Sequence, residues 1–316
     1  MRTSILKKHS YVLILFGVLL ALIIALSFAS PYFLSWKNAR NILNQSAMYL
    51  ILSIGMTFVI CAGQIDLSVG AIIGFVGVSV GLLINRGVSP ITAIFIGLFI
   101  GALLGAFNGL FVAYGKINSF IVTLSTMTIL RAVTLILTNS SSVFGFGDVI
   151  TFLGSGNVGP INMPIFISIV VVVIGGILLH RTVFGNYCLF LGTNETALGR
   201  AGVNVKKYKV MIFTLCGFCA SIAGLIVMGR LNSAEPLAGQ GYEMDAIATS
   251  ILGGTSIQGG KGNIIGTILA CLILNVMKNG LTLLAIPSHY QSIVTGFILL
   301  VSVLVSETSR RRRSEV

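Results

Sequence analysis

The sequence predicts an all-α, polytopic membrane protein with about ten transmembrane helices, one of them short or broken. Of the 316 residues, 55% are hydrophobic and only 9% are charged, and the mean hydropathy is +1.00. The apolar residues fall in runs of about 18 to 22, the length that a helix rising ~1.5 Å per residue needs to cross a ~30 Å hydrocarbon core. Water-soluble globular domains do not have this composition.

The spans follow from the apolar runs taken in order. The first run exceeds the ~7 to 15 residues of a signal-peptide core, so we interpret it as a retained helix. The eighth is short and rich in glycine, and a broken helix is tolerated at membrane depth only where protein or water meets its open backbone groups. The predicted spans are 11–30, 46–63, 68–84, 91–114, 119–137, 163–180, 208–229, 243–256, 263–279 and 289–306.

Lysine and arginine indicate the orientation. With the N-terminus placed inside, fourteen of the 20 basic residues fall on the inner side and five on the outer, and Arg131 lies within a span. Cytoplasmic loops carry the excess of positive charge. We therefore predict one transmembrane domain over 1–316, with both termini and a basic tail, 307–316, in the cytoplasm.

Two connections are longer than a turn between neighbouring spans. The outer one, 138–162, is rich in Ser, Gly and Asn, which is typical of a flexible external loop. The inner one, 181–209, contains a helix-forming stretch, 194–200, followed by a Gly-containing turn, and it exceeds what joining two antiparallel helices requires. We predict a short helix there, outside the bilayer.

Composition and motifs exclude several functions. The net charge of +12 sits on inner loops and the terminal RRRR, which fits anionic headgroups of the lipid bilayer better than nucleic acid. The stretch 254–262 lacks the glycine spacing and the Ser or Thr of a phosphate-binding loop, and neither HExxH nor GxSxG occurs. The five cysteines and three histidines are too scattered to predict a metal site. An enzyme is not expected.

Asp66 is a carboxylate between two apolar runs, where a charge beside hydrocarbon costs several kcal/mol. It should therefore face protein or water. Either Asp66 or Ser68 accepts hydrogen bonds from the free amides that open the third span, or they contact a substrate. Asp245, with Glu243, opens the eighth span, where a carboxylate either complements the helix dipole or binds a ligand.

The fifth span carries a polar stripe. Thr123, Met127, Arg131 and Thr134 recur at helical spacing, and arginine is rare at membrane depth. The stripe either lines a path for a polar solute, or Arg131 pairs structurally or reaches the headgroups.

Several long motifs, in one order from about residue 38 to 305, resemble the permease subunits of bacterial ABC importers for monosaccharides. The motifs are GMTFVICAGQIDLSVG (55–70), FIVTLSTMTILRAVTLILTNSS (120–141), GTNETALGRAGVNV (192–205), GYEMDAIATSILGGTSIQGGKGNIIGT (241–267), NGL (279–281) and YQSIV (290–294).

The resemblance implies a multi-pass protein of the bacterial inner membrane that translocates ribose or a related monosaccharide. It implies as partners a second permease subunit, most simply an identical copy, a cytoplasmic ATP-binding subunit that holds ATP and magnesium, and a periplasmic sugar-binding protein, with no cofactor in this chain. It places the contact with the ATPase on Asn194, Glu195, Ala197, Gly202 and Asn204. Two alternatives remain open: a secondary transporter or channel acting without an ATPase, and an importer of the same family for autoinducer-2, a nucleoside or an amino acid.

Overall fold

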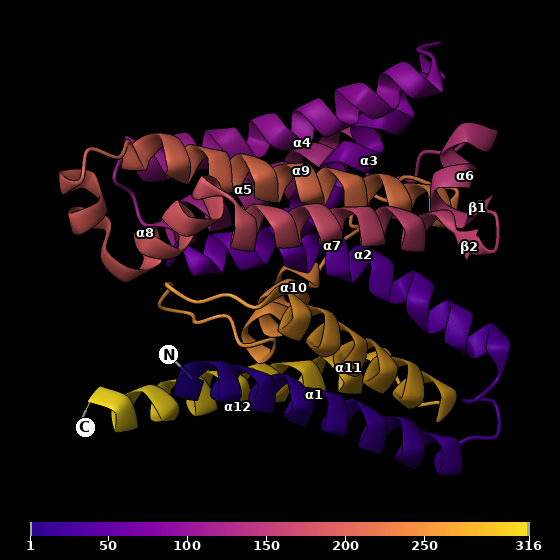
Figure 1. Ribbon diagram of the computed structural model, residues 1–316. Coiled ribbons are helices and arrows are strands. Elements are labelled where there is room, and N and C mark those ends of the chain that lie inside the picture. The colour runs from indigo at the N-terminus through magenta and orange to yellow at the C-terminus, as the bar shows by residue number, and fades with distance from the viewer. Residues whose placement is uncertain (1, 315–316) are drawn as a thin grey trace.

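Most residues of the computed structural model, which describes residues 2–314, lie in helices (Figure 1). Side chains are described for 11–298, 300–301 and 303–304, so those of the predicted basic tail lie outside the described residues. The elements are α1 (Arg2–Ala29), α2 (Trp36–Cys61), α3 (Val69–Asn85), α4 (Pro90–Ala113), α5 (Ser119–Thr138), α6 (Asp148–Ser155), β1 (Asn157–Val158), β2 (Ile161–Asn162), α7 (Met163–Arg181), α8 (Val183–Arg200), α9 (Val205–Leu231), α10 (Tyr242–Leu252), α11 (Ile264–Leu283) and α12 (Ser288–Ser314).

The long helices lie side by side, as transmembrane helices do (Figure 1). One group holds α2, α3, α4, α5, α7 and α9, and α1, α11 and α12 lie together beside it, with α10 between the two. α8 lies at one end of the helices, and α6 with the β1–β2 hairpin lies at the opposite end. The N- and C-terminal ends of the chain are both at the end that holds α8.

Seven helices among the described residues are long and apolar enough to cross a membrane, namely α1, α2, α4, α5, α7, α9 and α11. Each overlaps a predicted span. α3 is apolar but has only 17 residues, and α10 has 11, about 16 Å of helix, which cannot cross ~30 Å of hydrocarbon. The expectation that the eighth span is short is therefore confirmed.

Local capping sets where the helices begin and end. α2 begins ten residues before the predicted start of its span because the Ser35 side chain accepts from the backbone N–H of Asn38. Ser89 caps α4 with Pro90 in its first turn, and Asn118 caps α5. α5 ends at Thr138, and the next residue, Asn139, has the left-handed conformation that asparagine tolerates.

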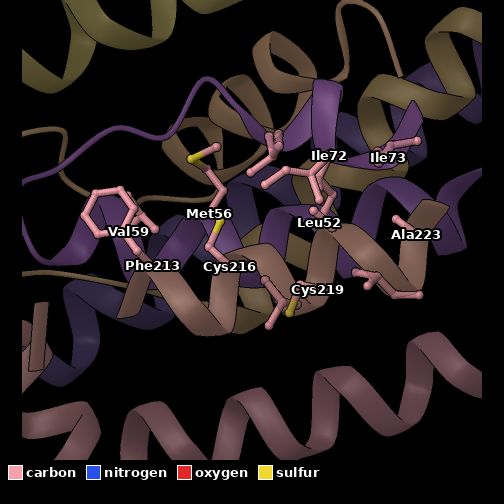
Figure 2. Packing of buried hydrophobic residues seen from close by; sticks show 14 of the residues in the cluster. Leu52, Met56, Val59, Ile72, Ile73, Phe213, Cys216, Cys219 and Ala223 are labelled. Carbon is pink, nitrogen blue, oxygen red and sulfur yellow. The ribbon is translucent and has the colours of Figure 1, made fainter. Parts of the chain in front are cut away.

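The buried core is centred on α2, α3 and α9 (Figure 2). The side chains that meet there include Leu52, Met56, Val59, Ile72, Ile73, Phe213, Cys216, Cys219 and Ala223. Because lipid is as apolar as these side chains, close packing rather than escape from water must hold such helices together.

α4 and α9 approach closely through small residues. Gly101, Gly105 and Gly109 repeat every four residues on α4, so they share one face. A Cβ on Gly105 would lie 2.2 Å from the carbonyl oxygen of Phe213, and one on Gly101 would lie 2.7 Å from that of Gly217. Glycine is therefore required for the backbones to pack at this distance.

The predicted external loop, 138–162, is not an open flexible connection. It contains α6, which packs on α9, and the β1–β2 hairpin. Ile150 is completely buried, and a Cβ on Gly154 would lie 2.1 Å from the backbone carbon of Gly229. The glycine that indicated flexibility in the sequence instead permits a close contact.

The predicted inner loop, 181–209, is mostly helical, and its helix is longer than expected. α8 covers 183–200 with one break, at Asn194, whose φ of −159° and ψ of 91° are not helical. The part before the break is fixed to α2, where the Cys188 thiol donates to the carbonyl of Phe58 at 3.1 Å. Burial raises the pKa of the Cys188 thiol well above its usual value, so this thiol packs rather than reacts.

Candidate functional site

Asp66 belongs to a buried hydrogen-bond network at the break between α2 and α3. Its Oδ1 accepts from the backbone N–H of Ser68 at 2.9 Å and from the Ser68 hydroxyl at 2.6 Å. Asn108 of α4 donates to the Ser68 hydroxyl at 2.8 Å, and Thr126 of α5 donates to Asn108 at 2.7 Å. All four side chains are buried. The Ser68 N–H precedes the first turn of α3, and no side chain caps that helix, so Asp66 does not accept from its opening amides. Through Ser68 and Asn108 it instead links the α2–α3 break to α4 and α5.

The predicted polar stripe of α5 faces other helices. Thr123 and Thr134 are buried, Met127 and Arg131 are partly buried, and Ile129 on the opposite face is 60% exposed. The Thr123 hydroxyl donates along its own helix, so its polarity is met locally. Met127 and Arg131 are the members of the stripe that a solute could reach.

Arg131 reaches the irregular segment between α9 and α10. Its Nη1 donates to the carbonyl of Ala238 at 2.7 Å. A Cβ on Gly74 of α3 would lie 3.4 Å from the same nitrogen, so the guanidinium lies beside a position of α3 that has no side chain. Its charge interacts with that of Glu243, in the first turn of α10. The arginine therefore pairs within the protein instead of extending to the headgroups.

Asp245, also in the first turn of α10, forms an ion pair with Lys278 of α11 at 2.6 Å. The Lys278 ammonium lies 5.0 Å from the ring centroid of Tyr49 on α2, which favours the charge. The rings of Tyr49 and Tyr242 have centroids 4.7 Å apart. The start of α10 is thus held to α2 and α11 by charge and aromatic contacts.

The predicted coupling residues lie beyond the ends of the long helices. Asn194 interrupts α8 and then accepts from the backbone N–H of Ala197 at 2.9 Å, so it caps the separate turn that follows. Leu198 is the buried residue of this turn, whereas Asn194 and Ala197 are exposed. Glu195 pairs with Lys209 of α9 at 2.7 Å.

Gly202 and Asn204 complete this segment. Gly202 has a φ of +83°, which favours glycine, and Asn204 caps α9 by accepting from the backbone N–H of Lys207 at 3.1 Å. Beside the segment lies a cavity of about 890 Å³, which the α2–α3 break, the α4–α5 turn, α8 and α9 surround. Its lining includes Gln64, Ile65, Lys116, Ser119, Glu195, Thr196, Gly199, Lys206 and Lys209.

The structure divides the sequence-predicted residues into three places. Asp66, Ser68 and Thr123 surround the α2–α3 break, Arg131 and Asp245 lie at the start of α10, and the coupling residues lie by the cavity. Sequence reasoning missed Asn108, Tyr49 and Lys278, although a polar or charged side chain in an apolar run could have indicated each. Among the described residues, no cluster of three or more His, Cys, Asp or Glu could hold a metal ion.

The α5 stripe gives the first testable prediction. In a background without the five native cysteines, a cysteine at Met127 or Arg131 should react with a water-soluble thiol reagent, and one at Ile121 or Ile129 should not. The first pair faces the interior, and the second pair faces outward, where lipid excludes water. Because Thr123 is completely buried, its cysteine should react more slowly than the first two. Equal protection at 127 and 131 would show that no water reaches this face.

Comparison with known proteins gives a consistent result. The family described as "Branched-chain amino acid transport system / permease component" matches residues 38–303. The chain is 45% identical to "Ribose import permease protein RbsC" of Bacillus subtilis (strain 168), over 91% of this chain and 90% of that protein. It is 43% identical to the protein of the same name from Escherichia coli (strain K12), over 91% of both, and 37% identical to "D-allose transport system permease protein AlsC" of the same strain, over 90% and 88%. No solved structure matches.

Proposed function

We propose that the solute of this chain is ribose. The chain belongs to the family described as "Branched-chain amino acid transport system / permease component". The chain is the permease of a sugar ABC importer and a multi-pass protein of the inner membrane. The observation that supports ribose is the identity of 43% to 45%, over 91% of the chain, with ribose import permeases, against 37% with the allose permease.

A permease of an ABC importer implies an ATPase and a substrate-binding protein as partners. We propose that ATP and magnesium are held by the ATPase, and that this chain performs no catalysis, because its relatives are transport components. The ATPase would dock on the segment that contains Glu195, Ala197 and Gly202. This segment is exposed and capped at both ends. A movement of the ATPase against it would therefore be transmitted to α8 and α9, which would move as rigid bodies.

The second permease subunit is, in this proposal, an identical copy. Within one chain Arg131 is only partly buried and Met244 is 45% exposed, which supports a second subunit facing them. Closed twofold symmetry is the commonest arrangement of such pairs.

The ten spans and the cytoplasmic termini also belong to this proposal. Both chain ends lie at the end that holds α8, which supports placing them together on the ATPase side (Figure 1). Alkaline phosphatase is active only outside the cytoplasm, so its fusion at Gly147 should be active and its fusion at Asn204 inactive. An active fusion at Asn204 together with an inactive fusion at Gly147 would show that the topology is the reverse of the one proposed.

Transport by the reconstituted importer tests the function. The chain would be assembled with its ATPase and its sugar-binding protein, and uptake of labelled ribose, allose and arabinose would be measured in proteoliposomes. We expect ATP-dependent uptake with ribose preferred, and calorimetry of the binding protein should show the same preference. Preference for another sugar would reject ribose, and uptake by this chain alone without ATP would reject the ABC mechanism in favour of a secondary transporter or channel.

A further inference from the structure

α10 starts inside the helix bundle rather than at one of its ends. Figure 1 shows it midway between the end that holds α8 and the end that holds α6. Its 11 residues are preceded by Gly241 in the left-handed conformation, so the chain turns sharply into the helix. In membrane transporters, discontinuous helices that begin near the midplane present their free amide ends to polar solutes.

Glu243, in the first turn of α10, has a carboxylate oxygen without a partner. Its Oε1 accepts from the backbone N–H of Gly241 at 3.2 Å, whereas Oε2 is buried with no hydrogen-bond partner. The residue as a whole is only 8% exposed. Leaving a charged acceptor buried and unpaired costs a few kcal/mol, so Oε2 should take a donor that the chain itself does not supply.

Arg131 lies close to this oxygen on the same face of α3. A Cβ on Gly70 would lie 2.1 Å from Glu243 Oε2, and a Cβ on Gly74 would lie 3.4 Å from Arg131 Nη1. Gly70 and Gly74 are one turn apart, a rise of about 6 Å. The two charges interact, yet no ion pair within 4.0 Å joins them in the part of the chain with described side chains.

A gap of more than 4.0 Å between the carboxylate and guanidinium atoms suits one hydroxyl group. Two hydrogen bonds of ~2.8 Å that meet at a single oxygen span about 4.6 Å at the tetrahedral angle and at most about 5.6 Å. A hydroxyl can donate to the carboxylate and accept from the guanidinium, of whose five N–H donors one already reaches Ala238. Because the two charges together carry no net charge, the pair does not favour a solute with a net charge, and a hydroxyl of an uncharged sugar suits both groups.

One tyrosine ring and an open edge complete the site. Tyr242 precedes Glu243 and packs against Tyr49, whose ring already lies beneath the Lys278 ammonium, so Tyr242 is the ring that can offer an apolar face to the C–H side of a sugar ring. Leu237 and Met244 on either side are 50% and 45% exposed, so the site is not sealed within this chain.

We propose that Glu243 and Arg131 hold one hydroxyl of the translocated sugar between them, with Tyr242 beside the sugar ring. This inference rests on the proposed sugar transport and adds to it a contact site at the start of α10.

Deoxy sugars test the contact directly. The complete importer in proteoliposomes would be supplied with saturating binding protein carrying D-ribose or a monodeoxyribose, restricted to analogues that calorimetry shows the binding protein to hold. For one analogue, wild-type uptake should fall about 10- to 100-fold relative to ribose, because a hydrogen bond to a charged group is lost. Glu243→Met should show a similar fall on ribose itself but little further fall on that analogue.

Glu243→Gln and Arg131→Lys keep the test decisive if the methionine variant fails to assemble. Each should reduce the discrimination between ribose and that analogue, which a purely structural role would leave unchanged. Asp148→Met, on the exposed first turn of α6, is the matched control and should transport like the wild type.

Equal discrimination in the wild type and in every Glu243 variant would overturn the site while leaving sugar transport intact. Equal wild-type uptake of ribose and of every monodeoxyribose tested would also overturn the site. Failure of the wild type to import any sugar would instead reject the proposed function on which the site depends.

Discussion

Replacing Glu195 with arginine should reduce ATP-driven sugar uptake at least tenfold while leaving the chain folded in the membrane. Glu195 is half-exposed on the capped turn of α8 and pairs with Lys209 at 2.7 Å. Lys209 is largely buried, but Glu195 is half-exposed, so an arginine at 195 can extend into solvent and the fold should tolerate the change. A reversed charge on a surface that must fit the ATPase is far more harmful, since like charges at an interface cost several kcal/mol. Uptake and ATPase retention should be measured on the same purified complexes.

The substitution Lys209→Glu, added to Glu195→Arg, distinguishes two explanations of the lost sugar uptake. If Glu195 acts by holding the turn to α9, the double variant Glu195→Arg with Lys209→Glu restores the pair and should restore uptake. If Glu195 contacts the ATPase itself, the double variant should stay inactive. Arg86→Glu, at the exposed C-cap of α3 and outside the docking segment, serves as a control for general effects of reversing a charge. Normal uptake and normal ATPase retention by Glu195→Arg would show that this turn is not the docking surface.

Replacing Lys278 with methionine should destabilise the protein by about 3 to 5 kcal/mol. The change leaves the Asp245 carboxylate unpaired where it is now 2.6 Å from an ammonium, and it removes the cation from the face of Tyr49. Removing one partner of a buried pair costs more than the pair contributes, because the remaining charge has lost the ammonium that compensated it. The midpoint of thermal unfolding in detergent should fall accordingly.

The double variant Lys278→Met with Asp245→Asn should recover most of this loss, since no charge is then left unpaired. Lys37→Met, which changes an exposed lysine just inside the start of α2, should leave the midpoint unchanged. A Lys278→Met protein as stable as the wild type would mean that water, rather than Lys278, compensates Asp245.

The sequence predicted the helices well because membrane spans depend on local composition. Hydrocarbon cannot satisfy backbone polar groups, so each apolar run must form its own hydrogen bonds as a helix. The span predicted over 119–137 is α5 at Ser119–Thr138, and that predicted over 163–180 is α7 at Met163–Arg181. The inward-facing side of the α5 stripe followed from the same helical periodicity.

The candidate sites depended on partners far away in the chain, which no local pattern contains. Asp66 could be proposed as a cap of α3, which it is not, and its connection through Ser68 to Asn108 arises only when α3 packs on α4. Arg131 was visible as a charge in a span, whereas the carbonyl that it binds comes from residue 238.

The amino-acid sequence by itself determined the membrane class, the helices and the family, since composition, apolar length and long motifs are properties of consecutive residues. Only the tertiary structure decided that α6 packs on α9 through Gly154, that Lys278 neutralises Asp245, and that Glu243 and Arg131 share one face of α3. These contacts join residues dozens to more than a hundred positions apart. The physical reason is that a buried charge or a bare glycine face acquires its role from whatever side chain or backbone the packing brings to within a few ångströms of it.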